Sequence, residues 1–401
     1  MCTRRRMHLD VTCSNCCGNR EEATGDSCYD AAAARMDFGL TRSQREIANL
    51  AGQLLDGGKP DQWKELARAG LLGLSLPPEL GGFQEPADQP GQPGQPGQPG
   101  QAGDGLAVLG PAVLLTEAGR RAAPVPALST LMTGMLPVAR WGDDDLRRVL
   151  LPPAAAGELI LTAAIREPSH PMPLVPAATV TDGTVTGTKV GVPYCAQAGR
   201  VLLPVRFGPA GGTGVVIVDP AAPGANVTRT PSAAGGPEYT LRLDQAPVEH
   251  VLGRGDCLTD LYQLAVAGAC CLADGALSAA LTLTRDHIAA RRQFGRPLAA
   301  FQAVAQQIAD VYIAWRTLHL ATVSACWRLG AGLDAAGDLA VAGYWCAQEA
   351  PRAVRTCHHL HGGTGMDQSY PLHHFSALIS DLVRFLGGGE YQLERLACSL
   401  N

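Results

Sequence analysis

The chain has few charged residues and no long uncharged apolar run, and both features limit the classes of protein to which it can belong. Charged residues make up 17% of the 401, and Lys and Arg total 32 against 37 Asp and Glu, giving a net charge of −5. This weakly acidic balance argues against binding to nucleic acid or to an anionic membrane. The sequence has no run of about 18 uncharged apolar residues, which argues against a membrane span. The apolar content of 46% is that of a globular protein, and the length suits two or three domains.

The 13 cysteines lack the spacing of a zinc site or of a secreted disulfide framework. Cys13 and Cys16 form a CxxC pair, but no second CxxC or His pair follows at a useful distance. The cysteines from Cys195 to Cys398 are scattered through apolar surroundings, which is typical of reduced thiols in a cytoplasmic protein. A histidine cluster at residues 358–374 has no carboxylate-rich partner and indicates hydrogen bonding near a cofactor. We therefore expect no metal site and a cytoplasmic location.

Residues 1–35 are predicted to be an extension that precedes the folded domains. They contain three consecutive arginines at positions 4–6, but the apolar segment of a signal peptide does not follow. Regular patterning begins at Met36, which we predict to be the native start. A repeated Gln-Pro-Gly tract interrupts the later helical pattern, and its Pro and Gly content predicts a flexible surface loop at 89–103.

The hydrophobic periodicity after Met36 changes twice. Residues 36–157 have a helical pattern that begins with a capping box formed by Thr41 and Gln44. Residues 158–256 read as short strands, with a strong hairpin signal at the Asp-Gly turn of residues 182–183.

Residues 257–401 are predicted to be helical again. A stripe of mainly apolar residues spaced three and four apart runs from Phe301 to Leu329, which is typical of the seam of a long helix in an antiparallel bundle. The sequence thus predicts a multidomain α+β chain with the order helices, strands, helical bundle.

Two C-terminal segments resemble the signature of the acyl-CoA dehydrogenase family. Residues 291–302 read RRQFGRPLAAFQ, and residues 359–365 read HLHGGTG and lead to a Tyr-Pro pair at 370–371. Further matches at residues 76–82 and 167–168 extend the resemblance to nearly everything from Met36 onward. It implies the family's fold: an N-terminal α-helical domain, a middle β-barrel or sandwich domain and a C-terminal four-helix bundle.

The residue types in these segments suit the pyrophosphate of a dinucleotide flavin. Arg291 offers planar bidentate donors, and a Gly-Gly pair lets backbone N–H groups approach an anion closely. Phe294 can cover the cofactor, and Gln302 offers both a donor and an acceptor. The resemblance implies that the ADP half of an FAD bound to the neighbouring subunit is held by Arg291, Phe294, Gln302, His359, Gly362 and Gly363.

The base that the family's reaction needs is missing at its expected positions. The reaction removes a proton α to the thioester carbonyl of an acyl-CoA and transfers hydride from the β carbon to the flavin, which requires a carboxylate. The family's two base positions correspond here to Ala265 and to Leu386 or Gly387, and none of these can accept a proton. Glu390 is the remaining candidate and would need a shifted loop. We predict no catalytic base in this chain.

The segment that packs on the flavin ring in this family also departs from the pattern. It reads KVGVPY at residues 189–194, so that Gly191 stands where an aromatic wall is expected and Pro193 has neither an N–H nor a hydroxyl. Arg166 precedes Glu167 where the family has a small hydroxyl residue. The pocket for the flavin ring is therefore predicted to lack its usual contacts, while the contacts to the pyrophosphate are predicted to be intact.

Three functions remain open at this point. The first is a subunit of an FAD-dependent acyl-CoA dehydrogenase, of the α2β2 type that acts on steroid side-chain CoA thioesters, which gives ADP-binding contacts to a catalytic partner. The second is a self-sufficient homo-oligomeric enzyme with a non-standard base. The third is a flavin-free scaffold subunit. Electron-transferring flavoprotein is the oxidant that the resemblance implies.

Overall fold

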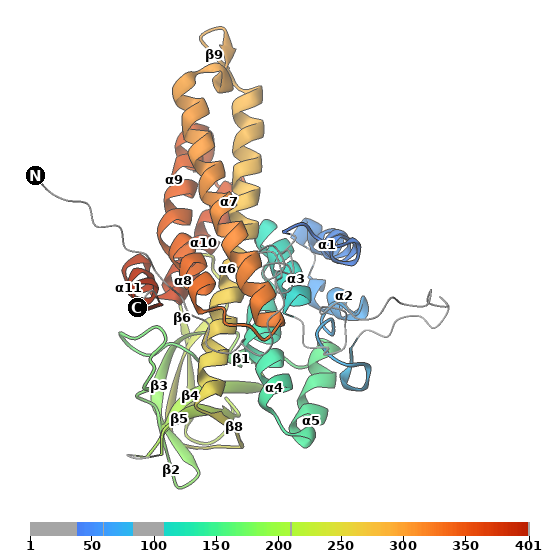
Figure 1. Cartoon of the computed structure of the whole chain (residues 1–401), viewed down its shortest axis with the longest axis vertical. Coiled ribbons are helices and arrows are strands. Elements are labelled where there is room, and N and C mark those ends of the chain that lie inside the picture. Colours follow the sequence, from blue (N-terminus) through green and yellow to red (C-terminus); the bar gives the residue numbers. More distant parts are fainter. Residues whose placement is uncertain (1–37, 59, 83–107, 209–210, 400–401) are drawn as a thin grey trace, which may run out of the picture. The chain divides into compact units, whose positions relative to one another are not determined.

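The computed structural model describes residues 38–58, 60–82, 108–208 and 211–399. The predicted extension 1–35, the start at Met36 and the Gln-Pro-Gly loop at 89–103 lie outside the described residues. The described residues form one compact unit. Its elements follow the predicted order of helices, a sheet and a second set of helices (Figure 1). The division into domains at residues 157 and 256 stays a prediction.

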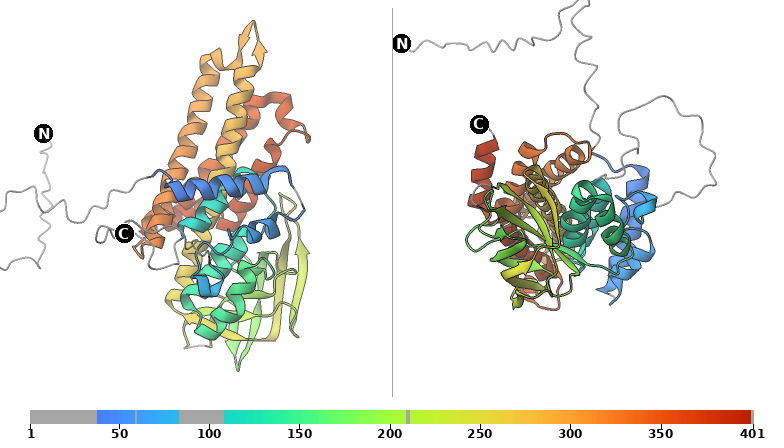
Figure 2. Two further views of the ribbon diagram at one scale, coloured as in Figure 1. Left: turned by 90° about the vertical axis from the view of Figure 1, so that its right-hand side faces the viewer. Right: turned by 90° about the horizontal axis from the view of Figure 1, so that it is seen from below.

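The N-terminal helices pack in layers against the C-terminal part of the chain. Helix α1 begins with the predicted capping box, because Thr41 Oγ1 accepts from the N–H of Gln44 and the Gln44 side chain accepts from the N–H of Thr41. Helix α1 packs on α3, and α3 packs on the long helix α6 (Figure 2). The helices of this region are α1 (Arg42–Leu55), α2 (Gln62–Arg68), α3 (Leu109–Arg120), α4 (Leu136–Trp141) and α5 (Asp144–Ala155), with a π-helical segment at Leu128–Met135.

The middle region is one mixed sheet with the strand order β6-β7-β3-β2-β4-β5-β8, to which β1 is added in parallel with β4. The predicted turn joins β2 to β3, with Asp182 at φ 47° and Gly183 at φ 75°. The sheet has an apolar core of its own besides the core that it shares with the helices. The strands are β1 (Leu161–Ala163), β2 (Thr179–Thr181), β3 (Thr184–Pro193), β4 (Arg200–Phe207), β5 (Thr213–Val218), β6 (Ala225–Thr230), β7 (Glu238–Pro247) and β8 (His250–Arg254).

The C-terminal helices pack around α6. Helix α6 is long and apolar enough to cross a membrane, but 78% of its most apolar window is buried inside the protein, as in the core helix of a bundle. It contacts α3, α7, α9 and α10. The elements of this region are α6 (Asp256–Ala290), β9 (Arg292–Gln293), β10 (Arg296–Pro297), α7 (Gln302–Gly330), α8 (Ala336–Tyr344), α9 (Ala350–His361), α10 (Leu372–Leu386) and α11 (Gly389–Ser399).

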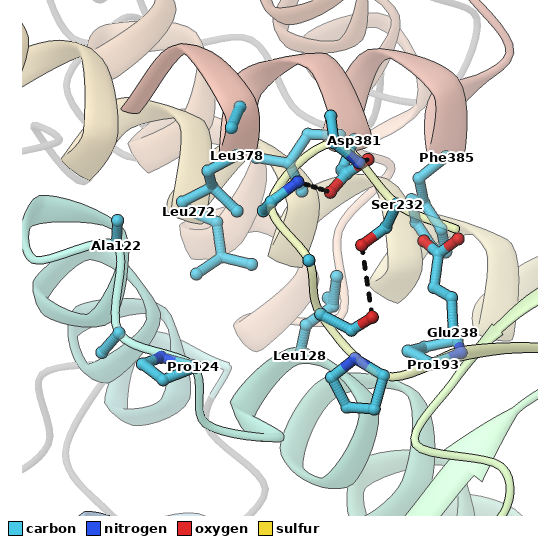
Figure 3. A pocket seen from close by; sticks show the side chains of 18 of the residues that line it. Ala122, Pro124, Leu128, Pro193, Ser232, Glu238, Leu272, Leu378, Asp381 and Phe385 are labelled. Carbon is cyan, nitrogen blue, oxygen red and sulfur yellow. Dashed lines mark hydrogen bonds between the residues drawn. The ribbon is translucent and has the colours of Figure 1, made fainter. Parts of the chain in front are cut away.

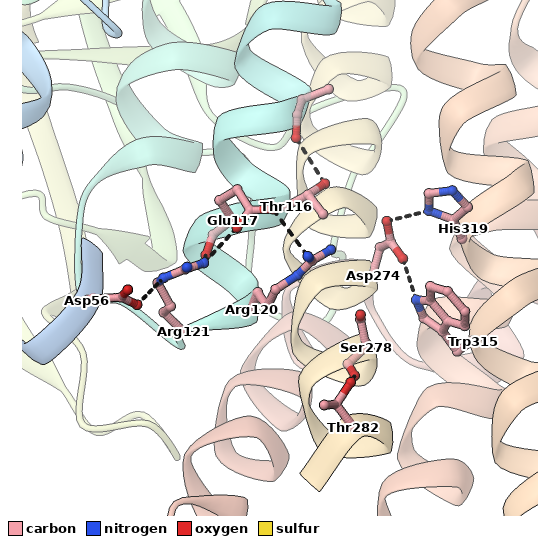
Figure 4. A network of polar contacts seen from close by, with 11 residues as sticks. Asp56, Thr116, Glu117, Arg120, Arg121, Asp274, Ser278, Thr282, Trp315 and His319 are labelled. Atoms are coloured by element: carbon pink, nitrogen blue, oxygen red, sulfur yellow. Dashed lines mark hydrogen bonds and ion pairs between the residues drawn. The ribbon is translucent and has the colours of Figure 1, made fainter. Parts of the chain in front are cut away.

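A buried carboxylate joins the two longest helices. Asp274 of α6 accepts hydrogen bonds from Trp315 Nε1 and pairs with His319 Nδ1 of α7, both at 2.9 Å (Figure 4). The predicted seam of α7 is buried from Val311 onward, whereas its first turns lie beside β9 at the end of the helix pair (Figure 1). The seam prediction therefore holds only for the part of α7 that has neighbours in this chain.

Candidate cofactor site and the positions of the base

The segment at residues 291–302 forms the exposed tip of the α6–α7 pair. Arg291 ends α6, with its N–H donating to the carbonyl of His287 at 2.8 Å. The short strands β9 and β10 then make a hairpin with Phe294 at φ 50° and Gly295 at φ 80°. The Phe294 side chain is 91% exposed, and Gln302, the first residue of α7, is also exposed. An aromatic ring held at a tip without cover in its own chain is placed to meet another molecule.

The second segment forms a glycine turn at the end of α9. Gly362 ends the helix at φ 58°, a conformation that residues other than glycine rarely adopt. A Cβ added at either Gly362 or Gly363 would meet no atom within 4 Å, so the backbone here faces open space. His359 is exposed on the last turn of α9, whereas His361 is buried.

The two segments lie at neighbouring helix ends. His287, one turn before Arg291, stacks on His361, the residue before Gly362, with ring centroids 4.4 Å apart. The structure therefore brings the arginine of one segment and the glycine turn of the other to one region of the chain. The N–H of Gly362 donates to the carbonyl of His359, so the donors left for an anion are the exposed guanidinium of Arg291 and the exposed backbone beside Gly363, a set that suits a pyrophosphate.

The histidines of this region are committed to hydrogen bonds. His358 pairs with the carbonyl of Gly365, and His373 with the carbonyl of Tyr370. No group of three or more His, Cys, Asp or Glu side chains in the described residues is arranged to hold a metal ion.

None of the three positions expected for the base has a side chain that could accept a proton. Ala265 in α6 and Leu386 at the end of α10 have no solvent exposure. Gly387 follows at φ 87°, packed so closely on Pro171 that a side chain would clash. Glu390 is exposed in the first turn of α11 and is not among the residues that line the two large cavities of the described chain.

Asp260 and Asp381, the other carboxylates close in sequence to the expected base positions, have partners. Asp260 accepts from Arg140 at 2.5 Å and from Trp141 Nε1 at 2.8 Å. Asp381 accepts from the backbone N–H groups of Ala233 and Ala234, both at 2.8 Å. A carboxylate held by several donors is fixed in place, so neither Asp260 nor Asp381 is free to approach a substrate carbon.

Side chains from other parts of the chain contact the segment at residues 189–194. The guanidinium of Arg166 lies against Gly191, 2.7 Å from the place where a Cβ would stand, and Arg384 reaches the same spot. Arg384 pairs with Glu238 at 2.8 Å and with Asp381 at 2.9 Å, whereas the buried Nε of Arg166 has no hydrogen-bond partner in the described residues. Burial, and next the charge of Arg384, lower the pKa of Arg166. Two guanidinium groups thus fill the volume of the missing aromatic side chain.

Backbone groups of the same segment are also engaged. The hydroxyl of Thr162 donates to the carbonyl of Pro193 at 2.7 Å, and the N–H of Tyr194 donates to the carbonyl of Pro237. The N–H of Val190 donates to the carbonyl of Arg166. These groups are not available to the polar edge of a flavin ring, which agrees with the predicted damage to the ring pocket.

Comparison with known proteins identifies the family. Residues 263–400 match the family model of the acyl-CoA dehydrogenase C-terminal domain. Over 372 residues the chain is 39% identical to acyl-CoA dehydrogenase FadE28 of Mycobacterium tuberculosis, covering 91% of this chain and 100% of that protein. The chain belongs to the acyl-CoA dehydrogenase family.

Solved acyl-CoA dehydrogenases have the same architecture. The ChsE4–ChsE5 complex of M. tuberculosis has a chain that matches with a TM-score of 0.80 at 29% identity, covering 91% of this chain and 99% of that one. A variant of the Tcur3481–Tcur3483 steroid acyl-CoA dehydrogenase matches with a TM-score of 0.78 at 29% identity, covering 89% and 97%. These matches confirm the predicted multidomain fold.

Family membership makes the chain an oxidoreductase that acts on acyl-CoA, in a family whose cofactor is FAD. The donors at Arg291, Gln302 and the glycine turn fit the phosphates of FAD. The segment at residues 189–194 does not fit the ring. Both parts of the predicted site are marked by local motifs, and their assignment to the cofactor stays a prediction.

A large cavity was not predicted. It has a volume of about 480 Å³ and lies between the turn after α3, the loop before β7 and helix α10 (Figure 3). Apolar side chains such as Leu128, Leu272 and Leu378 form one wall, and Asp381 lies at the edge, bonded to the loop. A second cavity of about 530 Å³ lies beside Pro171, Tyr262 and Tyr391, close to the base positions. Both are assembled from distant segments, so no local pattern marks them.

Proposed function

We propose that this chain is the subunit without a base in an α2β2 acyl-CoA dehydrogenase, in which it binds the ADP half of an FAD whose ring is held by a catalytic partner subunit. The observation that carries the proposal is the contrast between two parts of one family site. Arg291 and the turn at Gly362 are exposed, whereas Ala265 and Leu386 offer no base, and the segment at residues 189–194 gives a flavin ring no aromatic wall and no free N–H at its ends.

The partner is proposed to supply the missing chemistry. Bound FAD would supply the hydride acceptor for the β carbon of the acyl group, and a carboxylate of the partner would remove the α proton. The residues of this chain hold the pyrophosphate and orient the cofactor across the interface. The resemblance to the ChsE4–ChsE5 complex supports a pair of different chains, and the resemblance to a steroid acyl-CoA dehydrogenase supports a steroid side-chain thioester as substrate. We further propose electron-transferring flavoprotein as the oxidant and the cytoplasm as the location.

Expression with and without the partner tests the proposal. The chain purified alone is expected to contain little flavin and to show no turnover with acyl-CoA, because it lacks both ring contacts and base. Co-expression with a second acyl-CoA dehydrogenase chain that retains the carboxylate is expected to give a yellow complex that turns over. Full flavin content and normal turnover of the chain alone would refute the proposal.

Substitution of Arg291 tests the role of the tip within that complex. Hydrogen bonds to charged groups contribute about 1.5–3 kcal/mol, so Arg291→Ala is expected to weaken FAD binding roughly 10- to 150-fold. Arg285→Ala is a matched control, because Arg285 is exposed on the same helix and pairs only with its neighbour Asp286 in the described residues. Unchanged FAD binding in Arg291→Ala would instead support a scaffold that does not bind flavin.

A substitution at Glu390 distinguishes the proposed subunit from a self-sufficient enzyme. If Glu390 were the base, Glu390→Gln would abolish turnover, whereas the proposed function predicts that the complex keeps its rate. The exposed position of Glu390 outside the lining of both cavities supports the second outcome.

A further inference from the structure

The two halves of the proposed pyrophosphate site come from different helices, and a direct contact joins them. Arg291 follows α6, and Gly362 follows α9. The rings of His287 and His361 are stacked between these ends, with centroids 4.4 Å apart and planes at 26°. The carbonyl of His287 also accepts the N–H of Arg291. A shift of either ring would therefore move one half of the site relative to the other.

His361 is held in one orientation by the groups around it. The residue is 4% exposed. Its Nδ1 donates to the carbonyl of Cys357 at 2.8 Å, because a carbonyl can only accept. In a neutral ring Nε2 is then the acceptor, and it lies 3.0 Å from the hydroxyl of Tyr370. His361 thus connects the end of α9 to the segment before α10 and to the end of α6.

The charges around the stack favour neutral rings. Burial, followed by the charges of His361 and Arg291, lowers the pKa of His287. Burial also lowers the pKa of His361, with the charge of His358 acting in the same direction. Two protonated rings at this distance would repel each other and Arg291.

We infer that His287 and His361 are positioning residues, whose stack fixes Arg291 relative to the Gly362–Gly363 turn so that both can contact one pyrophosphate of FAD. Neither ring needs to touch the cofactor. The inference rests on the proposed function, because it concerns the same anion site. It assigns a purpose to a stacked histidine pair that the reaction itself does not use.

Two substitutions at His287 separate stacking from general stability. In the co-expressed complex, His287→Ala removes the ring, and a stacked aromatic pair contributes enough that FAD binding is expected to weaken roughly two- to tenfold. His287→Phe keeps a flat ring and is expected to restore binding to near the wild-type value. FAD dissociation is followed by the fluorescence of released flavin, and the melting temperature of each complex is measured in parallel. His250→Ala, in strand β8, is the control.

If the complex that carries His287→Ala fails to assemble, Tyr370→Phe provides a second test. It removes only the hydroxyl that holds Nε2 of His361, so a faster release of FAD is expected with the fold retained. Unchanged FAD release in both His287→Ala and Tyr370→Phe would overturn the inference, as would a His287→Phe variant as weak as His287→Ala. If Arg291→Ala weakens binding but these variants do not, the positioning role fails and the proposed function stands. If Arg291→Ala also has no effect, the proposed function fails.

Discussion

The Nζ of Lys189 and the Oε1 of Glu167 lie 2.7 Å apart in a part of the sheet that solvent hardly reaches. Lys189 has no solvent exposure at all. Glu167 also accepts from the N–H groups of Ala177 and Ala178. The Glu167 carboxylate therefore connects strand β3 to the segment after β1 and to the residues that lead into β2. Through Lys189 it also holds the start of the segment at residues 189–194 in place.

Removing one partner of this pair is expected to destabilise the protein strongly. Lys189→Met leaves Glu167 buried without its counter-charge, which costs about 3–5 kcal/mol. The loss would be read from chemical denaturation and from a lower melting temperature. The double variant Lys189→Met with Glu167→Leu is expected to recover most of it, because an apolar pair of similar volume replaces both charges. A single variant as stable as the wild type would contradict this account.

The same pair predicts a stability loss in acid. Burial raises the pKa of Glu167, but the charge and hydrogen bond of Lys189 and two backbone N–H donors outweigh it, so the pKa lies below its ordinary value of 4.5. A depressed carboxyl pKa stabilises the fold above the unfolded-state pKa, and the stabilisation is lost as the pH falls through the folded-state pKa. The stability difference between the wild type and Glu167→Gln should therefore be largest above about pH 5 and shrink below about pH 4.5. A difference that stays constant from pH 7 to pH 3 would refute this.

The loop before β7 is expected to loosen when Asp381 is replaced. Its carboxylate accepts both N–H groups of Ala233 and Ala234, and hydrogen bonds to charged groups contribute about 1.5–3 kcal/mol each. In Asp381→Ala, hydrogen exchange at these two amides should accelerate by a factor of ten or more. Exchange at the strand β5 amides serves as the internal reference. Equal protection of both amides in the variant and the wild type would show that the loop is held by other contacts.

Adding a carboxylate at a family base position is expected not to create an enzyme. Leu386 has no solvent exposure, so Leu386→Glu places an ionisable group in an apolar core and should cost about 3 kcal/mol or more. The altered segment around Gly191 would still give the flavin ring no pocket. We expect a lower melting temperature and no turnover of an acyl-CoA by the chain alone. Any gain in turnover would argue that only the base is missing.

Local signals predicted much of the fold and part of the site. The Thr41–Gln44 capping box and the hairpin at residues 182–183 were confirmed, because both depend on residues a few positions apart. The anion-binding residues could be predicted for the same reason, since motifs at Arg291 and Gly362 mark them, and their role stays a prediction. The seam of α7 was only partly correct, because the periodicity shows which face is apolar but not how far the neighbouring helices extend.

The sequence by itself determined the order of helices and strands, the family and the absence of a carboxylate at the expected base positions, because each follows from the identity of residues at fixed spacing. Only the tertiary structure decided which side chains meet. The stack of His287 on His361, the guanidinium of Arg166 beside Gly191 and the cavity edged by Asp381 all join segments far apart in the chain. Such contacts depend on how helices and sheet pack, and packing is a property of the whole core rather than of any short stretch.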